Sequence, residues 1–400
     1  MKTHMKKISI IIPVYNEIKF IKSTLESVIG QADEIIIGDN ASTDGTSDIC
    51  SDFASRYPEI KYTRHKENYG GKFNWNYVVD NAYGEYMLHV GGHDMIAPGY
   101  TRSLLDIMEN NPEAAMAFPK NIVLLNSDYT VKDFCNIGQY GNDILSDSPF
   151  VRVESMIKYY YYDSFGYGLF KRNLWLLIDR KYSVFDLGIG WNRGIFAALY
   201  GKIIADNSVN TIFYRMVPDR SKETETSNIG EAKRLFEKSV DPNSYDFACL
   251  CARACLLEEM QTLPNAPSLY AERLFKFIVK YMMRFYSIPV LKNMPGLLEE
   301  RKDFAEKVLY KVKKEIGKTP KAPWEKRNVL KKIIMYLLPY GIIYPHKILF
   351  AQNPREQYFL YSKTFNIKWI LPFFLVKLLE KILPPKPAHE SATLYRGIWW

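Results

Sequence analysis

Long apolar runs are missing from this chain of 400 residues. No stretch reaches the roughly 18 uninterrupted apolar residues of a membrane-spanning helix, so none is expected. The basic start, MKTHMKK, leads into an apolar run that Pro13 and Asn16 interrupt early, so no signal peptide is expected either. Internal repeats and low-complexity tracts are also absent from the sequence. With 47% hydrophobic and 24% charged residues, the composition is typical of a globular protein.

Cysteine is scarce, with five residues and no spacing typical of disulfides. Three of them cluster at Cys249, Cys251 and Cys255, but no histidine or fourth cysteine lies near them in the sequence. We therefore expect reduced thiols in a protein core, and no metal or redox centre at this cluster.

Acidic residues are outnumbered, and the formal net charge is +9. Such a balance favours partners that carry phosphate, namely nucleic acid, nucleotide-linked metabolites or an anionic membrane surface. The positive charge lies largely in the C-terminal helical part, and no nucleic-acid-binding motif accompanies it. Nucleic acid is therefore not expected as a partner.

Strand and helix signals alternate in the first part of the chain. Buried strands are predicted over 8–15, 33–40, 60–65 and 85–90, and helices over 18–31, 43–57 and 72–83. This alternation predicts an α/β fold with a doubly wound, mostly parallel sheet, whose ligands bind at the carboxyl ends of the strands. Each predicted strand ends in polar residues: Tyr15-Asn16-Glu17, Asp39-Asn40, His65 to Asn68, and Gly91 to Asp94.

The pattern changes further along the chain. A helix that ends at Gly201 and a strand into Tyr214 are predicted, and helical spacing dominates afterwards. Basic helices over 322–383, with Trp324 and Trp369, are interpreted either as a surface on an anionic membrane, which we favour, or as a packed subdomain. The expected regions are a first domain over 1–225, a basic helical region over 226–383 and a loosely ordered tail over 384–400.

Four motifs follow one another at the spacing found in glycosyltransferase family 2. They are SIIIPVYNE (9–17), EIIIGDNASTDGT (34–46), ENYGG (67–71) and GEYMLHVGGHDMIAP (84–98). The chain resembles this family strongly over 8–110 and weakly over 111–215. The resemblance implies a GT-A fold, a nucleotide-sugar donor, and transfer with inversion to a glycan or lipid-linked acceptor in bacterial surface-polysaccharide synthesis. It thereby favours a cytoplasmic enzyme held peripherally at the inner face of the membrane.

The ends of the first two strands are expected to meet the nucleobase. Pro13 fixes the backbone before Tyr15, and an exposed ring there suits stacking on a base, although it can also simply cap the sheet. Asp39 accepts hydrogen bonds only, which suits the N–H of uracil or thymine, so a UDP-sugar is favoured. Asp44 and Thr46 are interpreted as structural residues.

The next turn is expected to meet the phosphates. At Asn68 and Gly71 the backbone can approach a pyrophosphate closely, and Lys72 can neutralise phosphate charge. The family's Arg-Asn pair is replaced by Trp75-Asn76, so one phosphate contact is missing. Asn74 and Asn76 remain as candidates for polar contacts, or simply belong to a solvated helix face.

The fourth strand ends in Gly91-Gly92-His93-Asp94, where the family usually has two or three Asp that bind a divalent metal. The resemblance implies that Asp94 and His93 are metal ligands for Mn²⁺ or Mg²⁺, and that Glu17 also belongs to the donor site. A histidine ligand favours Mn²⁺. Alternatively, His93 replaces the metal and donates a hydrogen bond or a positive charge to the diphosphate. The remaining alternative is a non-catalytic binding or scaffold protein with a degenerate metal site.

An inverting transferase also needs a carboxylate that takes the proton of the acceptor hydroxyl. The family's position for it falls near residue 190, which is not acidic. Asp186 is the first candidate for this base and Asp163 the second. Trp191 is a candidate platform for the acceptor sugar, or a core residue. Lys171-Arg172 matches a basic pair common in the family, which either meets donor phosphate or is solvated.

Overall fold

A computed structural model describes residues 7–126, 128–136, 142–159, 166–182, 189–215, 242–282 and 302–318. The chain divides into two units, one that includes Met1–Val312 and one of Lys313–Arg396. The predicted basic helices of 322–383, the predicted tail and the domain boundary predicted at 225 all lie outside the described residues. The fold described below is that of the first unit.

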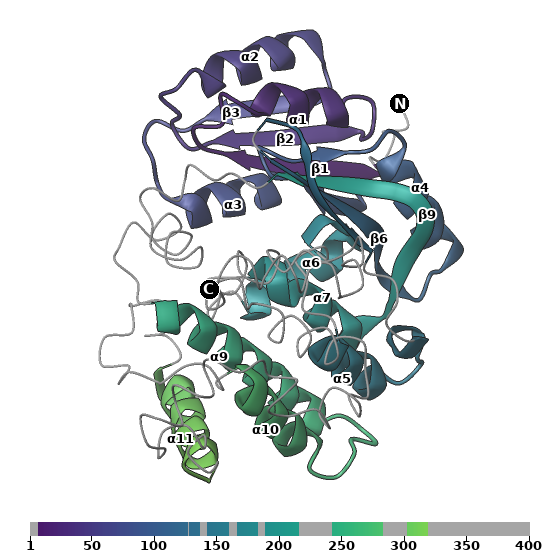
Figure 1. The fold of residues 1–400 in the computed structure, drawn as a ribbon, viewed down its shortest axis with the longest axis vertical. Coiled ribbons are helices and arrows are strands. Elements are labelled where there is room, and N and C mark those ends of the chain that lie inside the picture. The colour runs from purple at the N-terminus through teal and green to yellow at the C-terminus, as the bar shows by residue number, and fades with distance from the viewer. Residues whose placement is uncertain are drawn as a thin grey trace, which may run out of the picture. The chain divides into compact units, whose positions relative to one another are not determined.

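The strands and helices predicted in the first part of the chain are confirmed. They are β1 (Ile8–Val14), α1 (Ile21–Val28), β2 (Glu34–Asp39), α2 (Thr46–Arg56), β3 (Ile60–Arg64), α3 (Gly71–Asp80) and β4 (Tyr86–His89). The strands are parallel in the order β3-β2-β1-β4. Their β-branched isoleucines are buried because α1 and α2 cover one face of the sheet and α3 the other (Figure 1).

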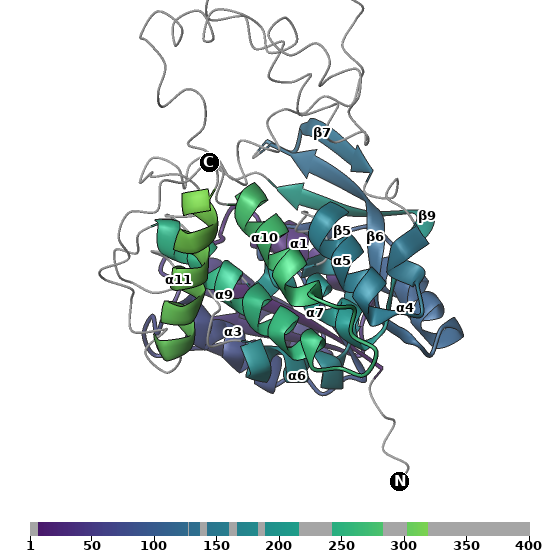
Figure 2. The same cartoon turned by 90° about the horizontal axis from the view of Figure 1, so that it is seen from below.

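The sheet continues beyond β4. The next elements are β5 (Met95–Ile96), α4 (Tyr100–Asn110), β6 (Ala114–Leu125), β7 (Val131–Asn136), η1 (Asn142–Leu145), α5 (Pro149–Tyr159), β8 (Leu169–Lys171), α6 (Arg172–Tyr182), α7 (Ile189–Tyr200) and β9 (Lys202–Arg215). The described strands follow the order β3-β2-β1-β4-β8-β6-β9-β5. Strand β7 pairs with β6 and lies beside it in Figure 2.

The strand directions agree with the predicted fold class. Strand β8 runs antiparallel to both β4 and β6, so β6 and its parallel neighbour β9 have the same direction as β1 to β4. The antiparallel strands among those described are β5, β7 and β8. The predicted helix before Gly201 and the strand into Tyr214 are confirmed as α7 and β9. The predicted α/β class with a mostly parallel sheet is therefore confirmed.

Three more helices follow: α9 (Pro242–Gln261), α10 (Tyr270–Met282) and α11 (Lys302–Lys318). Helix α9 is joined to α6 by a hydrogen bond of 2.8 Å from the Tyr182 hydroxyl to Glu259. Helix α10 is joined to α5 by one of 2.7 Å from the Tyr270 hydroxyl to the Phe150 carbonyl. Cys251 on α9 is buried, whereas Cys255 on the same helix is partly exposed. Within the described ranges, no helix is both long and apolar enough to cross a membrane.

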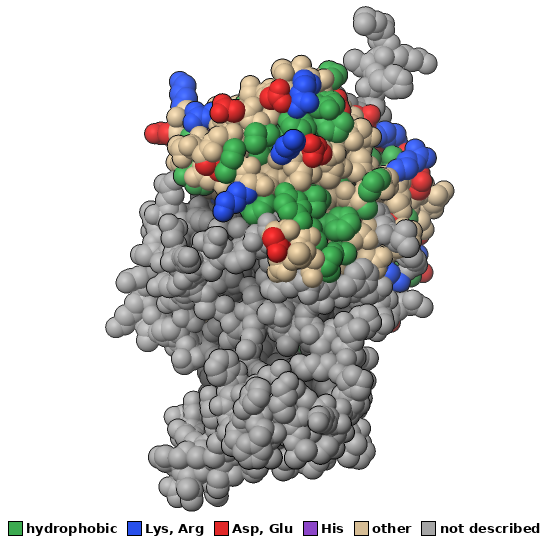
Figure 3. Space-filling view, turned by 45° about the horizontal axis from the view of Figure 1, so that its top comes forward, with side chains coloured by type: hydrophobic (Ala, Val, Ile, Leu, Met, Phe, Trp, Pro, Cys, Tyr) green, Lys and Arg blue, Asp and Glu red, His purple; other side chains and the backbone are tan. Residues whose placement is uncertain are grey.

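The face of the molecule in Figure 3 carries basic and acidic side chains in a mixed arrangement. Helices α1 and α2 both contain exposed ion pairs between residues one turn apart, Lys22 with Glu26 and Arg56 with Asp52. Such pairs contribute little to stability because water screens them.

Candidate functional site

The carboxyl ends of the four parallel strands meet at one edge of the sheet. In the pairing register Val14 lies beside Asp39, and Asp39 beside Arg64. Contacts join the segments that follow these strands, since the Asn40 side chain donates to Oδ1 of Asn68 over 2.5 Å. The predicted convergence of polar groups at this edge is therefore present.

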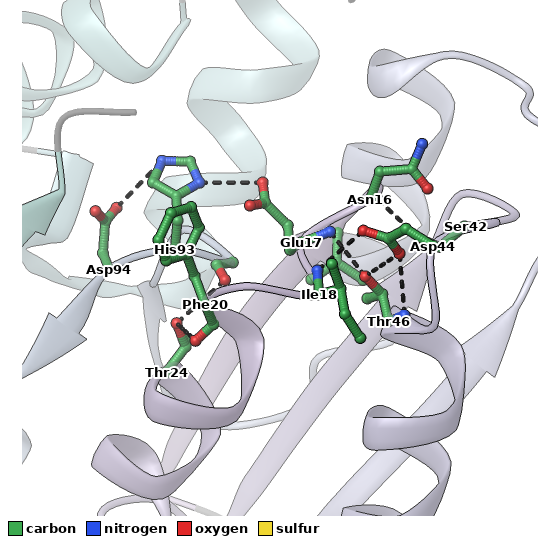
Figure 4. Close-up of polar contacts among 12 residues, drawn as sticks. Asn16, Glu17, Ile18, Phe20, Thr24, Ser42, Asp44, Thr46, His93 and Asp94 are labelled. Carbon is green, nitrogen blue, oxygen red and sulfur yellow. Dashed lines mark hydrogen bonds and ion pairs between the residues drawn. The ribbon is translucent and has the colours of Figure 1, made fainter. Parts of the chain in front are cut away.

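His93 lies between two carboxylates at this edge (Figure 4). Its Nδ1 is 3.1 Å from Oε1 of Glu17, and its Nε2 is 4.0 Å from Oδ2 of Asp94. The His93 side chain is 22% exposed, whereas the side chains of Glu17 and Asp94 are 6% and 0% exposed. Because an ionised carboxylate only accepts, we assign the Nδ1 proton of His93 to the bond with Glu17.

The backbone around Glu17 is held by the loop before α2. The Glu17 N–H donates to the Thr46 hydroxyl over 2.7 Å, and that hydroxyl donates to Asp44 over 2.6 Å (Figure 4). The Ile18 N–H donates to the other oxygen of Asp44 over 3.0 Å. Burial acts to raise the pKa of Asp44, but the hydrogen bonds from Thr46 and Ile18 outweigh it, so this pKa is lowered. Asp44 and Thr46 are thus structural, as interpreted.

Asp94 is turned toward the protein interior. Its Oδ2 accepts a hydrogen bond of 2.5 Å from the Tyr167 hydroxyl, and its N–H donates to the Gly91 carbonyl over 3.0 Å. The Tyr100 hydroxyl in turn donates to the Tyr167 carbonyl over 2.8 Å. Tyr167 has no counterpart among the sequence motifs, and nothing in the local sequence pattern indicated it.

The predicted metal ligands His93 and Asp94 lie near each other, with Nε2 of the first 4.0 Å from Oδ2 of the second. No group of three His, Cys, Asp or Glu side chains within the described residues could hold an ion. Glu17 and Asp94 lie at different nitrogens of the same imidazole, and one ring presents only one nitrogen to a given ion. An ion at Nε2 would therefore find one nitrogen and one carboxylate in His93 and Asp94, a poorer fit to Mn²⁺ or Mg²⁺ than the two or three aspartates that the resemblance implied.

The predicted nucleobase residues differ in accessibility. Tyr15, which follows Pro13 of β1, is 42% exposed, in agreement with the exposed ring that was predicted. Asp39 is fully buried and accepts hydrogen bonds from the Ser42 N–H (2.8 Å), the Ser47 hydroxyl (2.6 Å) and the Tyr62 hydroxyl (2.9 Å). Its carboxylate thus organises the turn between β2 and α2.

The turn before α3 has the predicted form. Oδ1 of Asn68 accepts a 2.9 Å hydrogen bond from the Gly70 N–H, and Gly70 has a φ of 86°, which glycine adopts without strain. The helix then begins at Gly71, and the Lys72 side chain is partly exposed. The first N–H groups of α3 and the Lys72 ammonium are suited to an anion.

Asn74 was a candidate for a polar ligand contact, but its side chain is buried and forms hydrogen bonds within the protein. Its Nδ2 donates to the Gly38 carbonyl over 2.8 Å, and its Oδ1 is 3.0 Å from Nε2 of His65. This side chain fastens α3 to β2, while Asn76 is exposed.

The basic pair Lys171-Arg172 lies at the wrong edge for a phosphate contact. Lys171 pairs with Tyr86, at the amino end of β4. The two side chains donate to the carbonyls of Pro112 and Ala82, both over 2.5 Å. The phosphate role considered for this pair is therefore wrong, because β8 runs antiparallel to β4.

An aromatic cluster that the sequence did not reveal surrounds His89 at the end of β4. The His89 ring lies edge-on to Trp75, with centroids 4.8 Å apart, and is stacked with Tyr167 at 5.8 Å. Burial, followed by the charges of Arg193 and His93, lowers the pKa of His89 to about 3. The ring is therefore neutral at physiological pH.

A buried guanidinium completes this cluster. The Arg193 side chain on α7 is fully buried, with its central carbon 3.9 Å from the Trp175 ring centroid and 5.2 Å from that of Trp75. Asp179 accepts from Arg193 over 3.0 Å and from the Trp175 indole over 3.1 Å. No acceptor among the described residues lies within hydrogen-bonding distance of Nε or Nη1 of Arg193.

Of the candidates for the catalytic base and the acceptor platform, the structure describes only the backbone of Trp191. Asp186 and Asp163 both lie outside the described residues. Trp191 belongs to the first turn of α7, but its side chain is outside the described part of the structure.

Comparison with known proteins identifies the N-terminal part of the chain. A family model for "Glycosyl transferase family 2" matches residues 9–157. Glycosyltransferase GlyA of Streptococcus pneumoniae is 29% identical over 154 residues, which are 37% of this chain and 20% of GlyA. The uncharacterized glycosyltransferase YibD of Escherichia coli is 32% identical over 108 residues, 26% of this chain and 31% of YibD.

The chain thus covers less than a third of either relative's length. Among solved structures, S. aureus TarS 1-349 is similar with a TM-score of 0.48 and 15% identity, over 76% of this chain and 82% of that one. The match over 9–157 contains every motif noted in the sequence and the whole edge that carries Tyr15, His93 and Asp94. Residues 9–157 of the chain are therefore similar to glycosyltransferase family 2.

Proposed function

We propose that this protein transfers a sugar from a nucleotide-diphosphate donor, with UDP favoured, to a glycan or lipid-linked glycan. One observation carries the proposal: the segment that matches the family is the one whose polar residues meet at a single edge of the sheet. Ligands of parallel sheets bind at this edge.

The donor is proposed to lie across the ends of β1 to β4. The exposed ring of Tyr15 offers a stacking surface for the base, a contact that contributes about 1–3 kcal/mol. The Asp39 carboxylate is buried, so its proposed contribution to base binding is indirect. It fixes the turn over Ser42 to Ser47 through hydrogen bonds. The Asn68 to Lys72 turn supports the pyrophosphate with N–H groups and a positive charge.

The reaction is proposed to be a single displacement with inversion. The acceptor hydroxyl oxygen attacks the anomeric carbon and gives its proton to a carboxylate, while the bond to the diphosphate oxygen breaks and the nucleoside diphosphate leaves. Asp186 remains the first candidate for that carboxylate, since it shortly precedes α7. Asp163 is the second, since it shortly precedes Tyr167, whose hydroxyl contacts Asp94. Trp191 is proposed as a platform for the acceptor sugar.

The proposed setting is the synthesis of bacterial surface polysaccharide at the inner face of the cytoplasmic membrane. Its support is the basic and apolar sequence pattern of residues 322–383, which is typical of peripheral binding to anionic lipid.

A panel of UDP-, GDP- and dTDP-sugars tests this function. The expected result is that one UDP-sugar raises the melting temperature of the full chain and is slowly hydrolysed. Binding without hydrolysis, and without transfer to lipid-linked or free glycans, would support the alternative of a non-catalytic binding protein. If no nucleotide sugar shifts the melting temperature, the proposed function is wrong.

A further inference from the structure

The arrangement of Glu17, His93 and Asp94 departs from that of a metal site. A divalent ion that took Nε2 of His93 would face Asp94, with Glu17 on the other side of the ring at Nδ1. An ion at Nδ1 would have to displace the hydrogen bond to Glu17. In either place His93 and only one of the two carboxylates can serve the same ion, so water and the diphosphate would have to supply the remaining oxygen ligands that Mg²⁺ requires.

The solvent exposure of these three side chains also differs from that expected of a metal site. Of the three side chains, His93 is the one with substantial exposure, at 22% against 6% for Glu17 and 0% for Asp94. A ligand that arrives from solvent therefore meets the imidazole before it meets a carboxylate. The Asp94 oxygen nearest the ring already accepts a hydrogen bond from the Tyr167 hydroxyl, which occupies one of its lone pairs.

The two glycines before His93 leave little room for further carboxylates. A Cβ added at Gly91 would lie 2.4 Å from Oδ2 of Asp94. A Cβ at Gly92 would lie 2.9 Å from Cγ1 of Val14 and 3.1 Å from Cγ of Glu17. Each distance is shorter than a normal carbon contact, so the present packing accommodates glycine and opposes the aspartates of a metal-binding motif.

We propose that this site binds the donor diphosphate without a divalent metal, and that the imidazole of His93 makes the contact that a metal makes elsewhere. The inference rests on the proposed use of a nucleotide diphosphate. In the complex, Nδ1–H of His93 stays bonded to Glu17, and Nε2–H donates to a phosphate oxygen. The ring then carries a positive charge toward the leaving group. Glu17 is a positioning residue, because it fixes the ring orientation from the side away from the ligand.

Metal binding can be measured directly on the full chain with Mn²⁺ alone. Chelator-treated protein is titrated with Mn²⁺, and free Mn²⁺ is followed by electron paramagnetic resonance, first without and then with UDP. We expect no saturable binding beyond that of UDP itself. Stoichiometric Mn²⁺ bound to the protein, or a ternary complex tighter than Mn²⁺–UDP, would overturn the proposal.

UDP affinity, measured by calorimetry with EDTA or with Mg²⁺ or Mn²⁺, separates this proposal from the proposed function. Equal affinity under all three conditions is expected. Affinity that appears only with a metal would overturn the metal-free site but leave the transferase intact. If UDP and every UDP-sugar fail to bind under all three conditions, the UDP-transferase proposal and this inference fall together.

Variants assign the contact to His93. His93→Ala should weaken UDP binding in EDTA by roughly tenfold or more, as expected for loss of a charge-assisted hydrogen bond. His93→Gln keeps a hydrogen-bond donor without the charge, so its UDP affinity should lie between those of the wild type and His93→Ala. The control Lys22→Ala removes a positive charge from α1, where the side chain is 69% exposed, and should bind UDP normally. Unchanged affinity in both His93 variants, with melting temperatures near that of wild type, would overturn the assignment.

Discussion

Glu17 and His93 are 76 positions apart in the sequence, yet Oε1 of the first lies 3.1 Å from Nδ1 of the second. Glu17 lies in the segment that follows β1, and His93 belongs to the turn after β4, so the parallel pairing of these two strands brings the residues together. The pair lies within the segment that matches the family. The contribution of this contact to donor binding can be tested without knowledge of the acceptor.

A double-mutant cycle should detect coupling between these two side chains. We expect Glu17→Ala and His93→Ala each to weaken donor binding, and the double variant to bind no more weakly than His93→Ala alone. A coupling free energy of about 1–2 kcal/mol is expected for a partly buried hydrogen bond to a charged group. Calorimetry with UDP gives the four affinities. Strictly additive effects would mean that Glu17 does not act through His93.

Removing the Tyr167 hydroxyl should destabilise the fold. Tyr167→Phe removes the hydroxyl that donates to the buried Asp94 carboxylate, and the expected cost is about 2–3 kcal/mol in the free energy of unfolding. The matched control is Tyr100→Phe, which removes a hydrogen bond to a neutral carbonyl and should cost about 1 kcal/mol. Urea denaturation compares the two variants. Equal losses would argue against a charged Asp94.

His89 should make the protein sensitive to mild acid. Its pKa is about 3 in the folded chain, against an ordinary value of 6.5. Between these values the unfolded chain binds a proton that the folded chain does not. The free energy of unfolding should therefore fall as the pH drops through this window, by about 1.4 kcal/mol per pH unit well inside it.

The variant His89→Phe keeps an aromatic ring beside Trp75 and Tyr167 and removes the titrating group. Its unfolding free energy should depend less on pH between about 6 and 4 than that of the wild type. Identical pH dependence in the two proteins would show that His89 is not the group responsible.

The catalytic base can be assigned by two conservative substitutions. If Asp186 takes the acceptor proton, Asp186→Asn should lower kcat by about 10²-fold or more, with UDP affinity unchanged. Asp163→Asn should then remain active, and the reverse result would assign the role to Asp163. Transfer assays and UDP calorimetry on both variants provide the two readouts. Full activity of both variants would place the base elsewhere.

The N-terminal half of the fold was predictable because its signals are local. Runs such as Ile10–Ile12 and Ile35–Ile37 form buried strands where they stand, and a polar residue after each strand falls at the carboxyl edge. The structural role of Asp44 and Thr46 followed from their place before a helix. The exposed ring of Tyr15 followed from its position after Pro13.

What sequence reasoning missed depends on contacts between distant segments. The sequence pattern around Asn74 also fits a solvated helix face, but the Asn74 side chain donates a hydrogen bond to the Gly38 carbonyl. Lys171 was aligned with a family position, yet the antiparallel pairing of β8 with β4 puts it at the other edge. Tyr167 reaches Asp94 across 73 positions, and no local pattern encodes such a contact.

Two sets of hydrogen bonds meet at Glu17 and have a consequence for protein engineering. Its N–H donates to the Thr46 hydroxyl, which donates to Asp44, and its carboxylate accepts from His93. Under the proposed function, the loop that supports the donor base also holds the backbone of Glu17, whose carboxylate orients the imidazole. We therefore expect that selection for a new donor base would also alter the rate of sugar transfer. Libraries at residues 42–46 should be screened for turnover together with affinity, with His93 and Glu17 allowed to vary in the same round.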